Sequence, residues 1–434
     1  MLRPFLAASP AFMSYFMSSS AHATRDLSRV EFIALVAALM ALNALAIDIM
    51  LPALPYMGEA LGITHENERQ LVVGVYMFGF GFAQLAFGPL TDRFGRRGPL
   101  LVGLVIYLVC AFAATFAPNF AVLLALRFVQ GLGAAGTRVI ATAVVRDKFS
   151  GRAMAEVMSL TFMVFMAIPI LAPGIGQLIL LAGPWQYIFL FMTGLAAVFA
   201  LWAFFRLPET LHPEYRRPLS IASVVDGFRI VVTNRQALFY GLAGTYLFGA
   251  MFGFVSASQQ IFVEIYGLGP YFPVAFAAMA GAIAVAQFVN SRVVRTYGMR
   301  RISHTAVLIY FVGAVIWLIL ALMGPIPFPL FFGIFIVIQW MFGWAASNMN
   351  SLSMEPLGAV AGTAASVFGF TQTVGGALIG TFIGQHYDGT LIPNALGYAS
   401  MGALVLICIL IAEKGKLFGV SPEYAHQRAD GGAH

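Results

Sequence analysis

The sequence contains twelve apolar runs, each about long enough to cross a lipid bilayer as a helix. A helix rises 1.5 Å per residue, so crossing the ~30 Å hydrocarbon core takes about 20 mainly apolar residues. The short alternating segments that membrane barrels require are not visible in the sequence. The chain is therefore predicted to be an all-α membrane protein. The twelve predicted transmembrane helices cover residues 31–55, 70–90, 98–117, 121–144, 156–181, 184–205, 236–263, 271–293, 301–323, 328–354, 358–385 and 393–413.

The composition excludes other classes of protein. Of the 434 residues, 60% are hydrophobic and 10% are charged, whereas soluble proteins carry roughly 25% charged residues. The chain therefore has too few polar side chains for a soluble multidomain enzyme, and it is too apolar to be disordered. Cys110 and Cys408 both lie in apolar runs, which argues against a disulfide framework or a thiolate metal site.

The basic residues indicate how the chain is oriented. Lys and Arg are enriched in the cytoplasmic loops of membrane proteins. If residues 1–30 lie inside, the other segments alternate so that only Arg69 of the 24 Lys and Arg residues falls in an outer loop, while Arg127 and Arg138 fall within a span. Both termini are therefore predicted to be cytoplasmic. The net charge of +6 follows from this orientation and does not indicate nucleic-acid binding.

The longest polar connection, residues 206–235, divides the spans six and six. A faint repeat supports two halves, because residues 93–97 resemble residues 296–300 at equivalent places. Two six-helix repeats are typical of transporters with a binding site near the membrane midplane. We expect a cytoplasmic N-terminal tail, a bundle, a cytoplasmic linker, a second bundle and a cytoplasmic C-terminal tail over residues 1–30, 31–205, 206–235, 236–413 and 414–434.

The most ordered polar motif is Gly-Pro-Leu-Thr-Asp-Arg-Phe-Gly-Arg-Arg at residues 88–97, in the loop after the second span. Gly95 suits a tight turn, and Asp92 is placed to pair with a neighbouring cation. A plain positive-inside loop would explain the arginines but not the ordered glycines and aspartate. We predict a conformational latch made by Gly88, Asp92, Arg93, Gly95, Arg96 and Arg97 with Arg146 and Asp147.

This decapeptide resembles the signature loop of the major facilitator superfamily. Residues 126–133 resemble the family's intramembrane arginine motif, and Pro169, Pro173, Gly174 and Gly176 resemble a degenerate form of its antiporter motif. Residues 48–55 are similar to the matching stretch of bacterial drug:proton antiporters of the bicyclomycin and chloramphenicol resistance type. The resemblance implies two pseudo-symmetric six-helix bundles in the bacterial inner membrane. We expect a monomer whose ligands are a small molecule and protons.

Asp48 is the only carboxylate placed well inside a predicted span, if Glu31 and Glu355 are interfacial. A lone charge there costs about 3 kcal/mol or more, so Asp48 is expected to load and release a proton near neutral pH. Arg127 cannot shuttle protons itself, but it can stabilise the ionised carboxylate. We predict that Asp48 and Arg127 couple protons to transport. The alternatives are a structurally paired or hydrated Asp48 and a snorkelling Arg127; for Arg138 the snorkelling and functional interpretations are equally open.

Several intramembrane residues have two interpretations. Pro169 and Pro173, with Gly174, are expected to bend the fifth span, either for gating or only to fit its neighbours. Residues 131–136 match the dinucleotide-binding pattern G-x-G-x-x-G, but they lie mid-span without a preceding strand, so close helix packing is predicted instead of cofactor binding. Polar residues within the spans also have two interpretations: they line a cavity, or they form hydrogen bonds between helices. We predict a substrate cavity that includes Asn43, Tyr246, Asn348 and Gln372.

The sequence shows no P-loop and none of the common catalytic motifs. We therefore expect no enzymatic activity, no cofactor and no metal site, with an ion gradient as the energy source. The predicted function is proton-coupled export of small amphipathic drug-like molecules by alternating access. One alternative is the same fold transporting a specific metabolite such as a sugar, nucleoside or siderophore. A remote alternative is a membrane enzyme or sensor without transport.

Overall fold

The computed structural model describes residues 27–149, 151–212, 214, 216 and 221–418. Within these residues, all regular secondary structure is helical, and twelve helical segments are long and apolar enough to cross a membrane. The all-α prediction and the twelve predicted spans are confirmed. The segments run over Arg29–Ala60, Glu66–Phe94, Arg97–Ala114, Phe120–Lys148, Glu156–Ala182, Gln186–Arg206, Arg235–Ile265, Gly269–Tyr297, Met299–Met323, Phe328–Gly358, Ala364–Gln385 and Ile392–Ala412.

The first span is broken after Asp48. The helix begins where the Ser28 side chain accepts a hydrogen bond from the Glu31 amide at 3.2 Å, and it ends before Pro52 and Pro55, which lack the amide donors that a helix needs. The N-terminal half contains α2 (Arg29–Asp48), η1 (Leu51–Ala53), α3 (Leu54–Ala60), η2 (Glu66–Gln70), α4 (Leu71–Phe94), α5 (Arg97–Ala114), α6 (Phe120–Lys148), α7 (Gly151–Ala182) and α8 (Gln186–Arg206).

The C-terminal half has the same number of spans; a π-helical turn ends its first span, and another interrupts its fifth. The elements from the linker onward are α9 (Ile221–Thr233), α10 (Arg235–Gln259), η4 (Gln260–Ile265), η5 (Gly269–Tyr271), α11 (Phe272–Tyr297), α12 (Met299–Met323), α13 (Phe328–Met354), η6 (Glu355–Val360), α14 (Ala361–Phe370), η7 (Thr371–Gly375), α15 (Gly376–Gln385) and α16 (Ile392–Ala412).

Glycines bring the helices within each half close together. A Cβ atom at Gly131 would overlap the Tyr76 carbonyl oxygen, and one at Gly79 would overlap that of Phe128. The α4 and α6 backbones are therefore in direct contact. The G-x-G-x-x-G pattern at residues 131–136 thus contributes to helix packing. In the other half, Gly249 and Gly253 of α10 lie against side chains of α15.

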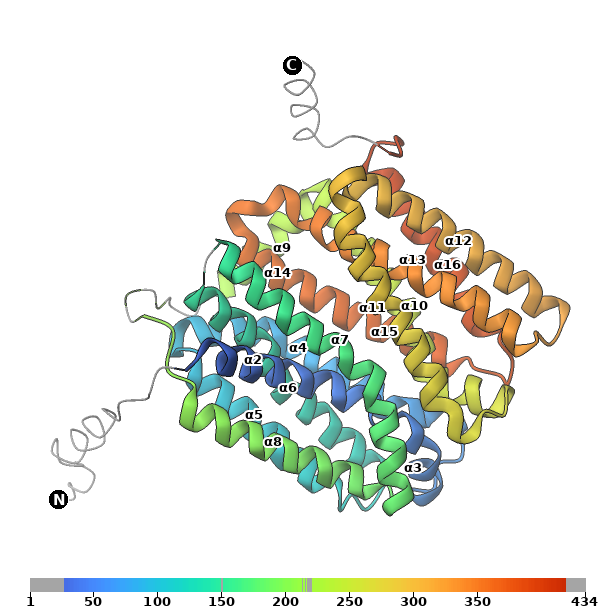
Figure 1. The fold of residues 1–434 in the computed structure, drawn as a ribbon, viewed down its shortest axis with the longest axis horizontal. Helices are drawn as coiled ribbons and strands as arrows, with labels where there is room; N and C mark the ends of the chain where they lie inside the picture. Colours follow the sequence, from blue (N-terminus) through green and yellow to red (C-terminus); the bar gives the residue numbers. More distant parts are fainter. Residues whose placement is uncertain (1–26, 150, 213, 215, 217–220, 419–434) are drawn as a thin grey trace, which may run out of the picture.

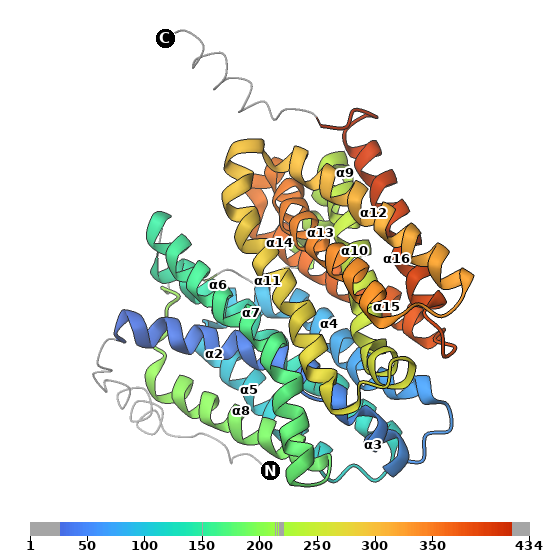
Figure 2. The same ribbon diagram turned by 45° about the vertical axis from the view of Figure 1, so that its right-hand side comes forward.

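The two halves lie side by side, with the blue-to-green bundle beside the yellow-to-red bundle in Figure 1 and Figure 2. They meet along α4, which packs against α14, η7 and α15, and along α7, which packs against α11. These two contact lines enclose the space between the halves. Any site shared by the halves must therefore lie between them.

The linker contains a helix that the sequence analysis did not predict. This helix, α9, packs against α14 and the start of α10, so the connection at residues 206–235 is not only polar chain. The predicted N-terminal tail up to residue 26 and the C-terminal tail from residue 419 lie outside the described residues.

Candidate functional site

Arg127 lies at the centre of the N-terminal half and is completely buried. Its guanidinium donates hydrogen bonds to the carbonyls of Val72 (3.1 Å) and Ala46 (2.9 Å) and to the Gln130 side chain (2.7 Å). It also lies 4.2 Å from the centre of the Tyr76 ring. Arg127 therefore joins α2, α4 and α6 through main-chain acceptors, and no carboxylate pairs with it among the described residues.

Asp48 lies two residues beyond the carbonyl that Arg127 holds. It is 7% exposed and has no side-chain hydrogen bond or ion pair within the described chain. Its position at the break between α2 and η1 means that movement of either segment displaces the carboxylate. A buried carboxylate without a cationic partner favours the neutral, protonated form.

A cavity of about 420 Å³ lies between the halves on one side of Asp48. Its walls come from α2, α4, α6 and α7 on one side and from α13, α14 and η7 on the other, and Gly88 and Gln372 line it. The cavity extends to Asp92, Arg96 and Arg146; the end of the molecule that carries these residues is called the basic end below. The opposite end, which carries Glu59, Glu66, Glu68, Glu264 and Asp388, is called the acidic end.

The four residues predicted to form a substrate cavity are not brought together. Only Gln372 lines the cavity. Asn43 accepts a hydrogen bond from the Tyr76 hydroxyl at 2.9 Å, and Asn348 donates to Asn290 at 2.9 Å. Tyr246 is half-buried in α10 and does not line the cavity. Asn43 and Asn348 thus join helices in this conformation.

The predicted latch contains a compact ionic cluster centred on Arg96. This side chain is 8% exposed and contacts Asp92 at 2.6 Å, Asp147 at 2.9 Å and the Thr91 hydroxyl at 3.0 Å. Burial tends to lower the pKa of Arg96, but the hydrogen bonds to Asp147 and Asp92 outweigh it and raise the pKa above its usual value. The cluster therefore keeps its charge and ties the end of α4 to the end of α6.

The other predicted latch residues take different positions. Gly95 has φ +91°, a conformation that favours glycine, and Arg97 begins α5. Arg146 lines the cavity beside the cluster without an ion pair among the described residues. The Arg93 guanidinium lies 5.7 Å from the centre of the Phe94 ring.

The acidic end is closed by polar contacts between the halves. The Asn67 amide donates to the carbonyls of Gln385 (3.1 Å) and Tyr387 (2.7 Å), and the Gln385 amide donates to the Asn67 carbonyl at 2.7 Å. Arg69 of η2 forms an ion pair with Glu264 of η4. We call these residues, with Gln70 and its partner Gln260, the acidic-end gate.

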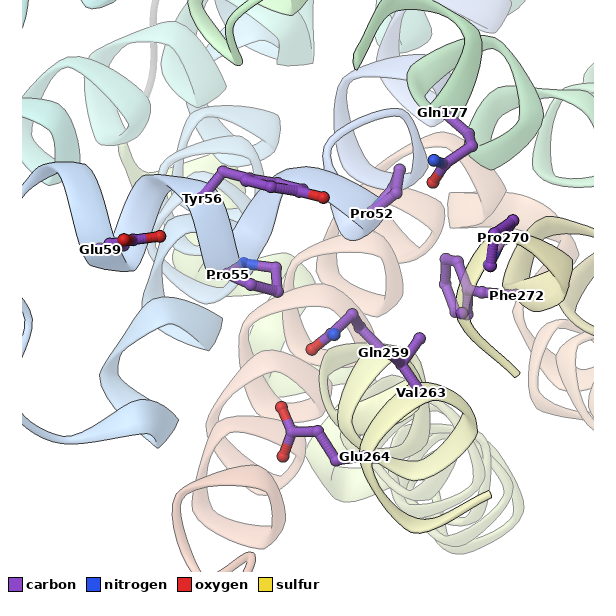
Figure 3. Close-up of a pocket in the computed structure, with 11 residues that line it drawn as sticks. Pro52, Pro55, Tyr56, Glu59, Gln177, Gln259, Val263, Glu264, Pro270 and Phe272 are labelled. Carbon is purple, nitrogen blue, oxygen red and sulfur yellow. The ribbon is translucent and has the colours of Figure 1, made fainter. Parts of the chain in front are cut away.

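A separate cavity of about 450 Å³ lies beside this gate. Figure 3 shows the Gln177 side chain directed into the space between Pro52 and Pro270, the Gln259 amide turned toward Pro55, and Glu264 at the edge of the cavity. Asp48 precedes Pro52 by four residues and follows Met40, which lines the basic-end cavity, by eight. Asp48 lines neither cavity, and along the first span it lies between Met40 and Pro52, and therefore between the levels of the two cavities.

Comparison with known proteins identifies the fold family. Residues 36–380 match the sequence profile of the Major Facilitator Superfamily. The chain belongs to the Major Facilitator Superfamily. It is therefore a multi-pass membrane transporter of small molecules and not an enzyme, as the sequence analysis predicted.

Named relatives and a solved structure extend this comparison. A bicyclomycin resistance protein homolog of Haemophilus influenzae is 30% identical, covering 87% of this chain and 94% of that protein. A chloramphenicol resistance protein of Pseudomonas aeruginosa is 29% identical, covering 86% and 85%. The crystal structure of a D-xylose-proton symporter superposes with a TM-score of 0.65 at 15% identity over 90% of this chain and all of that one, which is a likeness of fold alone.

The Major Facilitator fold of this chain contains polar contacts at the basic end that the sequence analysis missed. Glu209, in the linker, accepts hydrogen bonds from the amides of Arg96 (2.8 Å) and Arg97 (3.1 Å) at the start of α5. A carboxylate is stabilised at a helix N-terminus. The only sequence signal for such a contact is the general preference for acids at helix starts. This preference could not identify Glu209, because Glu209 is more than a hundred residues from its partners in sequence.

The C-terminal half of the transporter has its own buried cluster at the basic end. Arg300 is 8% exposed in its side chain and pairs with Glu355 at 2.8 Å and Glu413 at 2.9 Å. The Tyr240 hydroxyl donates to Glu413 at 2.8 Å and lies 3.0 Å from His304. The helix ends of the second half are thus held together by Glu413, directly after α16, and by Glu355, the first residue of η6. The loop between α11 and α12 does not repeat the aspartate that the first half has at Asp92.

The fifth span is the helix α7, with Pro169 and Pro173 inside it. A Cβ atom at Gly174 would meet nothing within 4 Å, whereas Gly176 lies against the Ile49 carbonyl just after Asp48. Figure 2 shows α7 curving along the first half toward the acidic end. The prolines thus lie where α7 packs beside the break in the first span.

Proposed function

We propose that this protein is a proton-coupled exporter of small amphipathic drug-like molecules in the bacterial inner membrane. It acts as a monomer with both termini in the cytoplasm. Its two bundles, residues 31–205 and 236–413, rock about the site between them. In this scheme the basic end is cytoplasmic, because basic loops are retained inside.

The observation that carries the proposal is the position of Asp48 between the two cavities. A buried carboxylate without a partner costs free energy when ionised, so it binds a proton when it is shielded and releases the proton when it meets water. The break after α2 and the hydrogen bond from Arg127 to Ala46 link the site to helix movement. Proton binding at Asp48 thereby changes which arrangement of the halves is favoured.

The conformation supports alternating access. The cavity of about 420 Å³ between the halves, called the central cavity below, reaches the basic end. At the opposite end, the acidic-end gate joins the two halves. In the proposed orientation this is an inward-open state, which is ready to take a substrate from the cytoplasm. Export then requires the gate contacts to break while the basic-end surfaces close.

Drug-like substrates are favoured by the names of the relatives, one for bicyclomycin resistance and one for chloramphenicol resistance. The cavity walls agree with this class, since methionine side chains from both halves and a phenylalanine line them. Flexible apolar walls suit ligands of varied shape.

The test replaces Asp48 by Asn in purified protein reconstituted into liposomes. We expect Asp48→Asn to abolish transport driven by a pH gradient, because a neutral amide cannot carry a proton, while its melting temperature stays close to that of the wild type. Asp226→Asn, on the exposed face of α9, is the matched control and keeps wild-type transport. Undiminished pH-driven transport by Asp48→Asn would remove Asp48 from the coupling mechanism.

A further inference from the structure

Arg138 is an intramembrane charge that the mechanism above does not use. It lies in α6, eleven residues beyond Arg127 and therefore about 16 Å closer to the basic end. Its side chain is exposed to the central cavity. In the described part of the chain, its guanidinium has no hydrogen bond and no ion pair. Arg138 is thus a charge inside the bilayer span that faces the space between the halves.

The acids in the same cavity form their ion pairs with Arg96 and not with Arg138. Asp92 and Asp147 line the cavity, but both are bound to Arg96, and the Thr210 hydroxyl also donates to Asp147 at 2.9 Å. Arg146 adds another positive charge at the cavity wall. The charged lining is therefore three arginines against two aspartates, a net charge of +1. The Arg96 cluster carries one net negative charge, and Arg138 and Arg146 carry the positive charges that have no ion pair within the described residues.

A guanidinium at this depth is costly unless a counter-charge or water compensates it. Its planar fork matches a carboxylate or a similar oxyanion through two parallel hydrogen bonds. The uncharged polar side chains of the lining are those of Gln84, Thr91, Thr142, Asn350, Ser366 and Gln372. The apolar part of the lining is supplied by Met40, Val139, Ala143, Met158, Met354, Ala365 and Phe368. The cavity thus combines a guanidinium deep in the span, unpaired within the described residues, with uncharged polar groups and an apolar wall.

We propose that Arg138 is an anion subsite, so that the transporter takes amphipathic molecules that carry one negative charge. This inference rests on the proposed function and narrows its substrate class. The anionic group lies at the Arg138 guanidinium, and the apolar body lies against the methionine and phenylalanine side chains. A volume of about 420 Å³ is within the usual range for small-molecule sites, ~300–1,000 Å³.

The test measures equilibrium binding to the purified full-length protein in lipid nanodiscs, without any gradient. Two matched pairs of probes separate charge from shape: chloramphenicol succinate with chloramphenicol, and nalidixic acid with its methyl ester. We expect Arg138→Gln to weaken binding of each anion about tenfold, as loss of a charge-assisted hydrogen-bonded pair implies. Binding of each neutral partner changes by less than about twofold.

Two further variants separate recognition from a structural role. Arg138→Lys keeps the positive charge but loses the two-pronged geometry, so it weakens anion binding less than Arg138→Gln does and leaves binding of the neutral partners unchanged. Arg292→Gln is the matched control, because Arg292 is an exposed arginine on α11 that stacks on Phe288 and does not line the cavity. It leaves the affinity for both members of each pair unchanged.

Several outcomes would overturn the subsite. They are equal weakening of anion and neutral ligand by Arg138→Gln, no weakening by that variant, no rescue by Arg138→Lys, and a wild-type protein that binds neither anion. Failure of the proposed function is a different result, in which Arg138-dependent binding persists but reconstituted protein shows no transport under a pH gradient. Conversely, transport of the neutral probes without Arg138-dependent binding would overturn the subsite and leave the proposed function in place.

Discussion

At the scale of single residues, Gly131 shows how closely the first bundle is built. The α4 backbone occupies the space where a side chain at Gly131 would lie, and the neighbouring Tyr76 ring stacks on Arg127. A methyl group at this position must push α4 away from α6. The displacement would also disturb the hydrogen bond from Arg127 to Val72, because Val72 is in α4.

We therefore expect Gly131→Ala to destabilise the protein by about 1–3 kcal/mol through overpacking. Gly194→Ala, in α8, is the control, since a Cβ atom there meets nothing within 4 Å. Alanine is also the better helix former, so this control is neutral or slightly stabilising. Thermal unfolding in detergent, followed by tryptophan fluorescence, measures both. Equal melting temperatures for the two variants would contradict the packing argument.

Residues differ in how far the sequence could predict their roles. Asp48 and Arg127 stand out because charges inside apolar runs are rare and have few structural uses. Asn43 and Asn348 were predicted to line the cavity but bond to Tyr76 and Asn290, because an amide on a span does not reveal whether it faces a cavity or a neighbouring helix. Glu209 was missed since its partners are distant in sequence.

At the scale of elements, the acidic-end gate depends on short segments at the ends of spans. Asn67 and Arg69 lie in η2, and Glu264 lies in the π-helical turn η4. These elements belong to different halves, so the contacts can hold only while the halves are close at this end. Their loss therefore favours the arrangement in which the acidic end is open.

Combined replacement Asn67→Ala and Glu264→Gln should shift the protein toward that open arrangement. Spin labels on cysteines introduced at Thr64 and Gly389, on opposite halves and away from the buried Cys110 and Cys408, report the separation by pulsed electron paramagnetic resonance. We expect the longer-distance population to increase severalfold. Glu68→Gln removes a charge from the same end outside the gate, and this control keeps the wild-type distribution. An unchanged distribution in the double variant would show that the gate contacts do not set the conformation.

Elements were more predictable than residue contacts. Each of the twelve spans was predicted because twenty apolar residues in succession have few alternatives to a membrane helix. The helix α9 was missed, since its thirteen residues are too few for a span and lie in a connection with several prolines. The gate elements η2 and η4 were also missed. The first is a short polar turn without a periodic signal, and most of the second lies in the apolar span predicted for residues 236–263, where the sequence does not distinguish a π-helical turn from an α-helix.

At the scale of the whole molecule, the charges moved per cycle depend on the substrate. In the proposed exchange, one proton enters as one substrate leaves. A neutral substrate then moves one elementary charge, whereas a monoanion moves two in the same electrical sense. Each charge gains about 2.3 kcal/mol from a potential of ~100 mV, so export of an anion gains about twice as much as export of its neutral analogue.

We therefore expect a charge-to-substrate ratio of about two for nalidixic acid and about one for its methyl ester, on the single-proton scheme. Transported charge, measured on proteoliposomes adsorbed to a solid-supported membrane, is divided by substrate flux from parallel radiotracer assays. Arg138→Gln should lose most of the anion current while keeping the ester current, because only the anion needs the guanidinium. Asp48→Asn should lose both, since neither substrate can then be exchanged for a proton. Equal ratios for acid and ester would mean that the carboxylate leaves protonated, in which case Arg138 does not carry it as an anion.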